Sequence, residues 1–411
     1  MSVSVGAMRQ QGAPNRGLSA ALIVLCQSTQ ALAFGGIGLF LPLIRQDMGL
    51  TFTQAGTLVA SMTLVYAFMQ VPAGYFADRL GAKRLFLTGL IGCNVLFLLL
   101  SQLHQYWLVF ANQALAGFFR GLVFAPGLLL ITSVFPPHRR ATALGLYVAG
   151  GFSSNVFLNL VGPLLVGPLG WRAIFVAFSV AGFALMVAYW RLGMPGPGGS
   201  GRGQMRLRDI PGLLRHRFMW LVGGIQYIRL AVVTGLAFWL PTLLVEKGYS
   251  LQVAGLLLAL SAGLTAPSNF LGGYLSDRLR QPLLVIGLSL AVLAVTTFLI
   301  VRVNALVLLV PVIGINGFFV QFYFGPLFAV PIQALGPKTA GLASGYGNFL
   351  ANLGGFTFAY ALGAVRDSTG SFADAIYVMS GLCVVGVVLV LILSRMKLPE
   401  ASVPHGAQSA S

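Results

Sequence analysis

The stretch Gly74-Tyr75-Phe76-Ala77-Asp78-Arg79-Leu80-Gly81-Ala82-Lys83-Arg84 lies between two long apolar runs. Charged residues between such runs are typical of a short loop that joins two membrane helices, so we predict a loop over residues 74–84. A second copy, Gly273-Tyr274-Leu275-Ser276-Asp277-Arg278-Leu279, occurs far downstream. The second copy has Arg280 at the place of Gly81, and no basic pair follows it.

The two copies belong to an internal repeat. Asp78 and Asp277 are 199 residues apart, and many other pairs keep this spacing or differ from it by a single residue. One offset held over so many positions indicates two structural halves of about equal length, with a substrate site near the midplane where they meet. The pairs at an offset of 199 are Pro42/Pro241, Gly49/Gly248, Gly56/Gly255 and Gly74/Gly273, and those at 200 are Gly117/Gly317, Pro126/Pro326, Pro137/Pro337 and Gly145/Gly345.

Both copies resemble the signature loop of the major facilitator superfamily of secondary transporters, which joins helices 2 and 3 and again helices 8 and 9. The first copy matches the family pattern G-x-x-x-D-R-x-G-x-[RK]-[RK] at every fixed position. Residues 41–56 also resemble the family's first outer loop, and Gly170-Trp171-Arg172-Ala173-Ile174-Phe175 resembles the start of its helix 6. The resemblance covers the chain outside the tails and the linker. It implies an all-α membrane protein of twelve transmembrane helices in two six-helix halves, with both termini cytoplasmic.

Composition also indicates a membrane protein. Hydrophobic residues make up 57% of the chain and charged residues 8%, which excludes a soluble domain. We therefore expect a multi-pass protein of the plasma membrane or cell inner membrane, with an N-tail over 1–17, a six-helix bundle over 18–192, a linker over 193–217, a second bundle over 218–394 and a C-tail over 395–411. The expected spans are 18–43, 53–76, 85–103, 107–134, 141–166, 171–190, 218–243, 251–275, 283–301, 305–330, 341–365 and 376–394.

The distribution of basic residues predicts the orientation. If the N-terminus is cytoplasmic, 18 of the 25 lysines and arginines fall on that side and five on the other. The net charge of +17 is thus a topology signal, and we expect no nucleic-acid partner. Cys26, Cys93 and Cys383 are scattered through apolar runs, so we expect neither a metal nor another cofactor. The expected protein is a monomer in the lipid bilayer.

Two basic residues remain, and both lie in the middle of expected spans. Arg120 and Arg229 are about 16–20 Å from the starts of their spans, close to the bilayer midplane. Their repeat partners are Val320 and Gln30, so the fold itself does not require a cation at these positions. All eight acidic residues lie in loops, tails or helix ends. A buried charge needs a partner, and the simplest partner here is an anionic substrate.

Polar side chains on the same spans can complete a binding site. Gln27 and Gln226 are repeat partners, and Gln30 is the partner of Arg229. Each of these residues is equally consistent with a hydrogen bond between helices. The further candidates are Asn155 with Asn159, Asn352 with Asn348, and Gln321, Tyr323 and Tyr346.

The signature loop predicts a gate. Gly74 and Gly273 allow helix ends to pack closely, and Asp78 can form a charge cluster with the basic residues that follow it. In the superfamily this cluster is taken to hold the inner gate shut in the outward-open state. The gating candidates are Gly74, Asp78, Arg79, Lys83, Arg84, Gly273, Asp277 and Arg278; topology and folding support is the alternative role.

These observations favour a secondary transporter that moves a small organic anion, plausibly a carboxylate, by alternating access. A co-transported proton or an exchanged anion would be its second partner. A proton-coupled multidrug or metabolite exporter of the same fold is the alternative, and a non-transporting membrane receptor is a third. The spans contain no acidic residue of the kind that carriers of cationic drugs use. No catalytic triad, metal cluster or phosphate-binding loop is present in the sequence, so we do not expect an enzyme.

Overall fold

A computed structural model of the chain describes residues 15–136, 139–196, 217–335 and 340–396, and every regular element within them is a helix. The elements, in chain order, are α1 (Arg16–Leu39), α2 (Leu41–Met48), α3 (Phe52–Leu80), α4 (Ala82–Leu100), α5 (Tyr106–Val134), α6 (Arg140–Leu192), α8 (Arg217–Glu246), α9 (Leu251–Leu279), α10 (Pro282–Arg302), α11 (Leu306–Phe322), α12 (Phe324–Leu335), α13 (Ala340–Thr369) and α14 (Ala373–Arg395).

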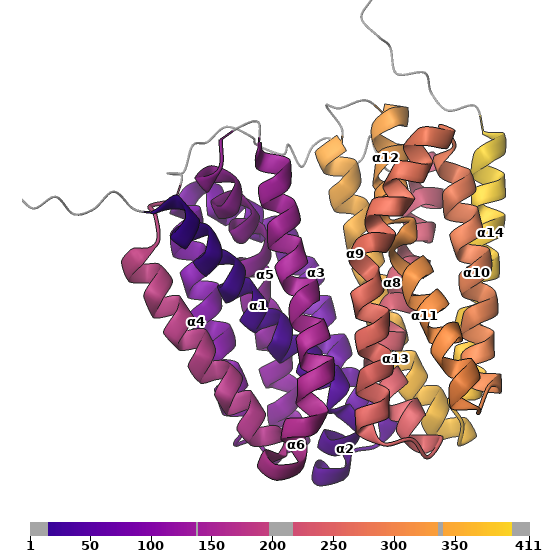
Figure 1. Ribbon diagram of the computed structural model, residues 1–411, viewed down its shortest axis with the longest axis horizontal. Coiled ribbons are helices and arrows are strands. Elements are labelled where there is room, and N and C mark those ends of the chain that lie inside the picture. Colours follow the sequence, from indigo (N-terminus) through magenta and orange to yellow (C-terminus); the bar gives the residue numbers. More distant parts are fainter. Residues whose placement is uncertain (1–14, 137–138, 197–216, 336–339, 397–411) are drawn as a thin grey trace, which may run out of the picture.

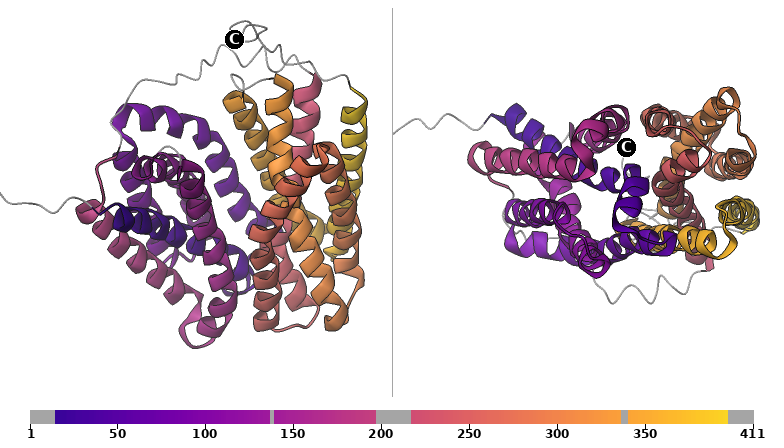
Figure 2. Two further views of the ribbon diagram at one scale, coloured as in Figure 1. Left: turned by 45° about the horizontal axis from the view of Figure 1, so that its top comes forward. Right: turned by 90° about the horizontal axis from the view of Figure 1, so that it is seen from below.

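The helices form two side-by-side groups. Helices α1–α6 lie on one side of the molecule and α8–α14 on the other, and we refer to these groups as the N-terminal and C-terminal halves (Figure 1). The halves touch where α3 packs against α13, α6 against α9 and α1 against α8. Their ribbons lie close together at the end of the molecule that carries α2 and diverge toward the opposite end, where the chain enters α1 and leaves α14 (Figures 1 and 2).

The prediction of a loop over residues 74–84 is wrong for most of that stretch. Helix α3 continues to Leu80 and helix α4 begins at Ala82, so Gly81 alone connects them. Gly81 has φ 86° and ψ 133°, a conformation open to glycine and strained for other residues. The second copy is likewise the last turns of α9, and Arg280 ends that helix in the left-handed region at φ 52°. Charged helix ends can extend beyond the apolar core without ceasing to be helical.

Four expected spans differ in continuity from the observed helices. The spans expected over 141–166 and 171–190 are joined in α6, which bends sharply at Gly170 (φ 76°, ψ 157°). The span expected over 18–43 is interrupted at Phe40, between α1 and α2. The span over 305–330 is interrupted at Tyr323, between α11 and α12. Pro326 has no N–H to bond the carbonyl of Phe322, and that carbonyl instead approaches Gly272 of α9 closely.

The repeat appears in the structure as matched helix boundaries. Gly49 and Gly248 both have positive φ, at 62° and 88°, and each ends a helix. Two residues later, Thr51 and Ser250 each cap the next helix with a hydroxyl that accepts a backbone N–H. These devices begin α3 and α9 in the same way and give the two halves the same internal register.

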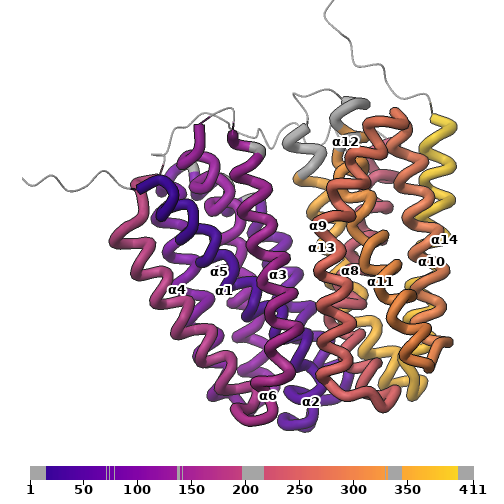
Figure 3. Tube along the Cα trace, viewed as in Figure 1, coloured from indigo at the N-terminus to yellow at the C-terminus, as the bar shows by residue number. Residues whose placement is uncertain are grey.

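Within the described residues, ten helical segments are long and apolar enough to cross a membrane, by length and composition. The twelve-span count and the boundaries of the tails, bundles and linker remain predictions. Most of the expected linker, residues 197–216, lies outside the described residues, as do Pro137, Pro337 and Lys338; uncertain placements are grey in Figure 3.

Candidate functional site

Arg120 lies near the middle of α5, as the sequence predicts. Its guanidinium carbon lies 3.5 Å from the ring centroid of Phe34 on α1 and 4.8 Å from that of Tyr66 on α3. Stacking against aromatic faces attracts a cation but leaves the N–H groups at the edge of the guanidinium plane free to bind an anion. Arg120 is therefore a cation lined by aromatic rings within the N-terminal half.

Arg229 lies near the middle of α8 and is more enclosed, with 3% of its surface exposed. Its Nε donates to Oε1 of Gln226 one turn earlier, at 3.0 Å, and its guanidinium carbon lies 5.0 Å from the ring centroid of Phe324. Gln226 was predicted as a site residue, and the structure brings it together with Arg229. A neutral amide and a ring hold the guanidinium in place without cancelling its charge.

Neither arginine has an acidic partner among the described residues. The ion pairs found there join Arg172 to Asp47 and Arg366 to Glu246; Arg172 follows the bend of α6 at Gly170, and the other three residues lie at helix ends. An unpaired charge at the centre of a membrane helix costs about 2.5–3.5 kcal/mol even on insertion scales. Two such charges, one in each half, favour a site for a negatively charged ligand.

The other predicted polar residues mostly bond within the protein. Gln30 donates to Oδ1 of Asn94 on α4 at 3.1 Å, and Gln27 accepts a hydrogen bond from Tyr147 on α6 at 3.0 Å. These contacts join helices of the N-terminal half, so both residues make the hydrogen bonds between helices that were the alternative to a role in substrate binding.

The asparagine pairs bond along their own helices. Asn155 donates to the carbonyl of Gly151 at 3.2 Å, and Asn352 donates to the carbonyl of Asn348 at 2.8 Å. Their Oδ1 atoms are not used in these bonds. The structure thus gives both asparagines a local role and does not connect them to either arginine.

A set of buried polar atoms near the interruption of α11 and α12 lacks a protein partner. Tyr323 is fully buried, and neither its hydroxyl nor Oε1 of Gln321 makes a hydrogen bond in the described structure. Phe324, the residue after Tyr323, has its ring centroid 5.0 Å from the guanidinium carbon of Arg229. Unpaired buried polar groups of this kind are suitable for a polar ligand or water.

The predicted gate residues make contacts within their own halves. Lys83 donates to the carbonyl of Gly193 at 2.7 Å, and its Nζ lies 5.1 Å from the ring centroid of Tyr189. These two contacts of Lys83 join α4 to the end of α6. Arg79 lies over Tyr75 at 4.6 Å, and Arg278 reaches the hydroxyl of Tyr274 at 3.5 Å. Arg84 and Asp277 are exposed.

Gly273 faces Gly325 of α12, because a Cβ on Gly325 would lie 3.8 Å from the Cα of Gly273. A Cβ on Gly273 would meet nothing within 4 Å, whereas its neighbour Gly272 makes the close approach to Phe322. The surroundings of Gly74 and Asp78 lie outside what the structure describes.

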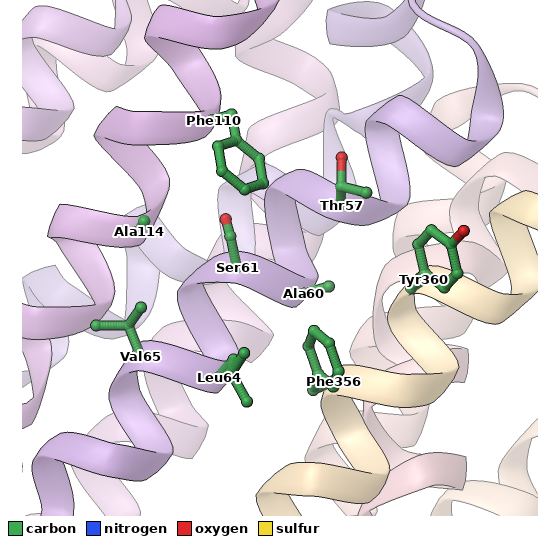
Figure 4. Close-up of a pocket in the computed structure, with 9 residues that line it drawn as sticks. All are labelled: Thr57, Ala60, Ser61, Leu64, Val65, Phe110, Ala114, Phe356 and Tyr360. Atoms are coloured by element: carbon green, nitrogen blue, oxygen red, sulfur yellow. The ribbon is translucent and has the colours of Figure 1, made fainter.

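A cavity of about 470 Å³ lies between α3, α5 and α13, and it contains neither arginine (Figure 4). Two of its hydroxyl groups are already bonded: Thr57 donates to the carbonyl of Gln54 at 2.7 Å, and Ser61 to that of Leu58 at 3.0 Å. This apolar cavity does not suit an anion. Its lining residues are Thr57, Ala60, Ser61, Leu64, Val65, Phe110, Ala114, Phe356 and Tyr360.

Sequence reasoning missed the aromatic residues that surround the two cations, namely Phe34, Tyr66 and Phe324. An aromatic residue in an apolar span has the same sequence pattern as one that faces lipid or core. The available signal was the repeat, because Phe34 pairs with Val233 and Tyr66 with Thr265, so these rings accompany Arg120 in one half only.

Comparison with known proteins identifies the family. Residues 23–359 match the model of the Major Facilitator Superfamily. The chain is 26% identical to the "Probable sulfoacetate transporter SauU" of Cupriavidus necator, over 83% of this chain and 84% of the relative. It is 24% identical to the D-galactonate transporter of Escherichia coli, over 85% and 89% of the two chains.

Solved structures agree on the fold. A bacterial homologue of the human lysosomal transporter Spinster, crystallised in an inward-facing and occupied conformation, superposes with a TM-score of 0.80 at 17% identity, covering 94% of this chain and 98% of that one. The family match, the apolar helices and the bacterial relatives together identify a multi-pass inner-membrane transporter, and the chain belongs to the Major Facilitator Superfamily.

Proposed function

We propose that this protein is a secondary transporter that moves a small organic anion across the cytoplasmic membrane by alternating access. The observation that carries the proposal is the pair Arg120 and Arg229, two cations at the middle of membrane helices whose described surroundings are aromatic or neutral. A bound anion would supply the missing charge.

The contacts of the two cations favour a carboxylate or a similar planar or branched acid. A guanidinium presents paired N–H donors in its plane, which match the two oxygens of a carboxylate. The aromatic contacts of Arg120 use the faces of that plane and leave its edges available. Sulfoacetate and galactonate, the anions named for the two relatives, carry such groups. Gln226 supports Arg229, and Gln321 adds an unbonded oxygen that could accept from a ligand hydroxyl.

The proposed topology has twelve crossings. Dividing Arg140–Leu192 at Gly170 turns the ten apolar segments into eleven, and α13 is the twelfth. Both termini lie on the cytoplasmic side in this proposal, because the basic residues are concentrated there. The divergence of the halves toward the termini then corresponds to a cytoplasm-facing state.

In this proposal the helix ends that carry Asp78 and Asp277 close the cytoplasmic side in the opposite state. Only the first copy has the basic pair Lys83 and Arg84. Replacing Asp78 by Asn should therefore reduce transport more than the same change at Asp277. Equal and mild effects of the two changes would leave these residues with a folding role.

The test of the anion site is transport by purified protein in liposomes. The substitutions Arg120→Gln and Arg229→Gln should each lower uptake of sulfoacetate or D-galactonate about a hundredfold, because each removes charge-assisted hydrogen bonds to the substrate. Arg302 provides a matched control, since it also lies over aromatic rings, at 5.6 Å from Phe298 and Tyr377, but at a helix end. Arg302→Gln should transport at the wild-type rate. Normal uptake by both central variants would contradict the proposal.

A further inference from the structure

One aromatic ring connects the cation of the N-terminal half to the C-terminal half. Phe34 of α1 lies under the guanidinium of Arg120, with 3.5 Å between the guanidinium carbon and the ring centroid. The same ring packs against Phe238 of α8, with 5.2 Å between centroids and planes at 87°. A perpendicular pair at this separation is a favourable aromatic contact. Phe34 thus touches the proposed substrate cation and the opposite half at once.

The position of Phe238 is fixed by close packing. Phe238 is 3% exposed, and a Cβ on Gly38, one turn after Phe34, would lie 2.7 Å from its Cδ1. The absence of a side chain at Gly38 therefore lets the ring of Phe238 approach α1. Phe238 can leave Phe34 only if α1 and α8 themselves move apart.

This arrangement is not a general requirement of the fold. Phe34 corresponds in the repeat to Val233, and Arg120 corresponds to Val320. The C-terminal half therefore has neither a cation nor an aromatic ring at the positions that correspond to Arg120 and Phe34. Phe34 and Arg120 occur together in one half, which indicates a role tied to the cation rather than to helix packing.

We propose that Phe34 is a positioning residue that ties the orientation of Arg120 to the contact between the two halves. The inference rests on the proposed anion site. With Phe238 in place, Phe34 is confined, and its face holds the plane of the guanidinium so that the N–H edge can meet an anion. When α1 and α8 separate, Phe34 loses this support, the guanidinium gains freedom, and anion affinity falls.

The consequence is a difference in anion affinity between the two states of the transporter. A ligand shifts a conformational equilibrium only by its differential affinity for the two states. An anion that binds best when Phe34 contacts Phe238 favours the state in which α1 and α8 touch, and separation of these helices promotes its release. Phe34 would then contribute to specificity for anions that need both edges of a fixed guanidinium.

The test uses full-length protein in liposomes, with sulfoacetate and D-galactonate as probes. Phe34→Leu keeps an apolar side chain but removes the ring face, and should raise the half-saturating anion concentration about tenfold with a smaller change in maximal rate. Phe34→Tyr keeps the face and should restore the wild-type value. Phe97→Leu removes a buried ring that stacks on Phe175 within the N-terminal half, and should leave the half-saturating concentration unchanged.

A double variant tests the coupling. Phe238→Leu should also raise the half-saturating concentration, and combining it with Phe34→Leu should add little, because both changes break one chain of contacts. Additive effects, or a Phe34→Leu protein with wild-type half-saturation, would overturn the inference while leaving the anion site intact. Wild-type protein that exchanged neither probe would overturn the proposed function, and the inference with it.

Discussion

Asp367, near the end of α13, accepts three hydrogen bonds from Phe52 and Thr53 in the first turn of α3, although Thr53 lies 314 positions before it in the sequence. Its carboxylate oxygens lie 3.1 Å from the backbone nitrogen of Phe52, 2.7 Å from that of Thr53 and 2.6 Å from the Thr53 hydroxyl. A carboxylate from one half thereby occupies the helix N-terminus of the other, where unpaired N–H groups and the helix dipole favour a negative charge.

The contact lies within a larger junction at the α2 end of the molecule. The ring of Phe52 packs against Phe372 and Trp239 of the opposite half, at 5.3 Å and 6.2 Å between centroids. Arg366, which pairs with Glu246, lies over the same ring at 4.8 Å. The side chain of Phe52 and the carboxylate of Asp367 therefore close this end of the molecule from opposite directions.

Asp367→Asn should weaken the closure at this end. The amide carries no charge and keeps only one oxygen as an acceptor, so it cannot replace the carboxylate at all three donors. Because Asp367 is exposed, we expect the closed state to lose about 1 kcal/mol of stability, which is about fivefold in the ratio of closed to open states. Distances between spin labels at the exposed residues Gln46 and Ala305 should shift toward longer values. Glu400→Gln, in the C-tail, is the control for loss of a carboxylate. An unchanged distance distribution in Asp367→Asn would show that the aromatic contacts alone keep this end closed.

The pH dependence of this closure follows from the pKa of Asp367. Burial acts to raise the pKa, but the hydrogen bonds from Thr53 and Phe52 lower it, and the net pKa is below its ordinary value. The contact therefore stabilises the closed end fully above the ordinary carboxyl pKa of about 3.9, and the stabilisation is lost as pH falls through the lowered value. The label distances should stay constant between pH 5 and 8. A transition within that range that disappears in Asp367→Asn would contradict the assignment.

Two repeat-related glycines bring the halves together at this end. A Cβ on Gly56 would lie 2.6 Å from the carbonyl oxygen of Ala359 in α13, and one on Gly255 would overlap the carbonyl oxygen of Asn159 in α6. Overpacking of this kind costs about 1–3 kcal/mol. Gly56→Ala and Gly255→Ala should each reduce transport about tenfold by holding the halves apart.

The matched control for these variants is Gly263→Ala, on the same helix as Gly255, because a Cβ at Gly263 would meet nothing within 4 Å. This variant should transport normally and gain slightly in thermal stability, since alanine is the better helix former. Transport that fell equally in all three variants would mean that backbone flexibility, not the space between the halves, is what the glycines provide.

The residues that follow the last turns of α3 and α9 should respond in opposite ways to substitution. Gly81 occupies a backbone region that is strained for other residues, so Gly81→Ala should destabilise the protein by about 1–3 kcal/mol. Arg280 has φ 52°, in the left-handed region, so Arg280→Gly should be neutral or slightly stabilising. Thermal unfolding of the purified variants measures both. A lower melting temperature for Arg280→Gly would show that its side chain makes a contribution greater than the backbone strain.

The sequence was informative where a local rule determines the structure. The gaps between the expected spans contain Gly49, Gly248 and Gly170, and helices end at the first two and bend at the third. Arg120 and Arg229 lie near the middle of their helices, as expected. Helix ends and span lengths could be predicted because they depend on residues close in the chain. The expected loop over 74–84 was wrong because polarity indicates exposure to water and does not indicate the end of a helix.

Contacts between distant residues could not be predicted in the same way. Asp367 was expected at a helix end, but its partner at Thr53 depends on how the two halves meet. Asn155 and Asn352 each have a second asparagine four residues away on the same helix face, a spacing that suits paired amides. Each instead donates to a backbone carbonyl one turn earlier, which is within reach of an asparagine in a helix. Local bonds of this type satisfy the amide donor without a ligand.

The last prediction concerns the driving force of transport. Importing a monovalent anion into a cell that is negative inside costs about 2.3 kcal/mol per 100 mV. Proton-coupled carriers usually offset this with an acidic or histidine side chain that titrates within the membrane. In the described structure Glu246, Asp277, Asp367 and Asp374 all lie at helix ends, and an arginine does not release a proton in proteins.

We therefore expect that any proton that moves does so with the substrate, while Arg120 and Arg229 supply a fixed positive charge that successive anions neutralise. Liposomes loaded with unlabelled D-galactonate should exchange it for labelled D-galactonate with equal pH on both sides, because exchange of like anions moves no net charge. Arg120→Gln in the same liposomes is the control for leakage. A strict requirement for a proton gradient, abolished by replacing one protein side chain, would identify a titrating coupling residue and contradict the fixed-charge mechanism.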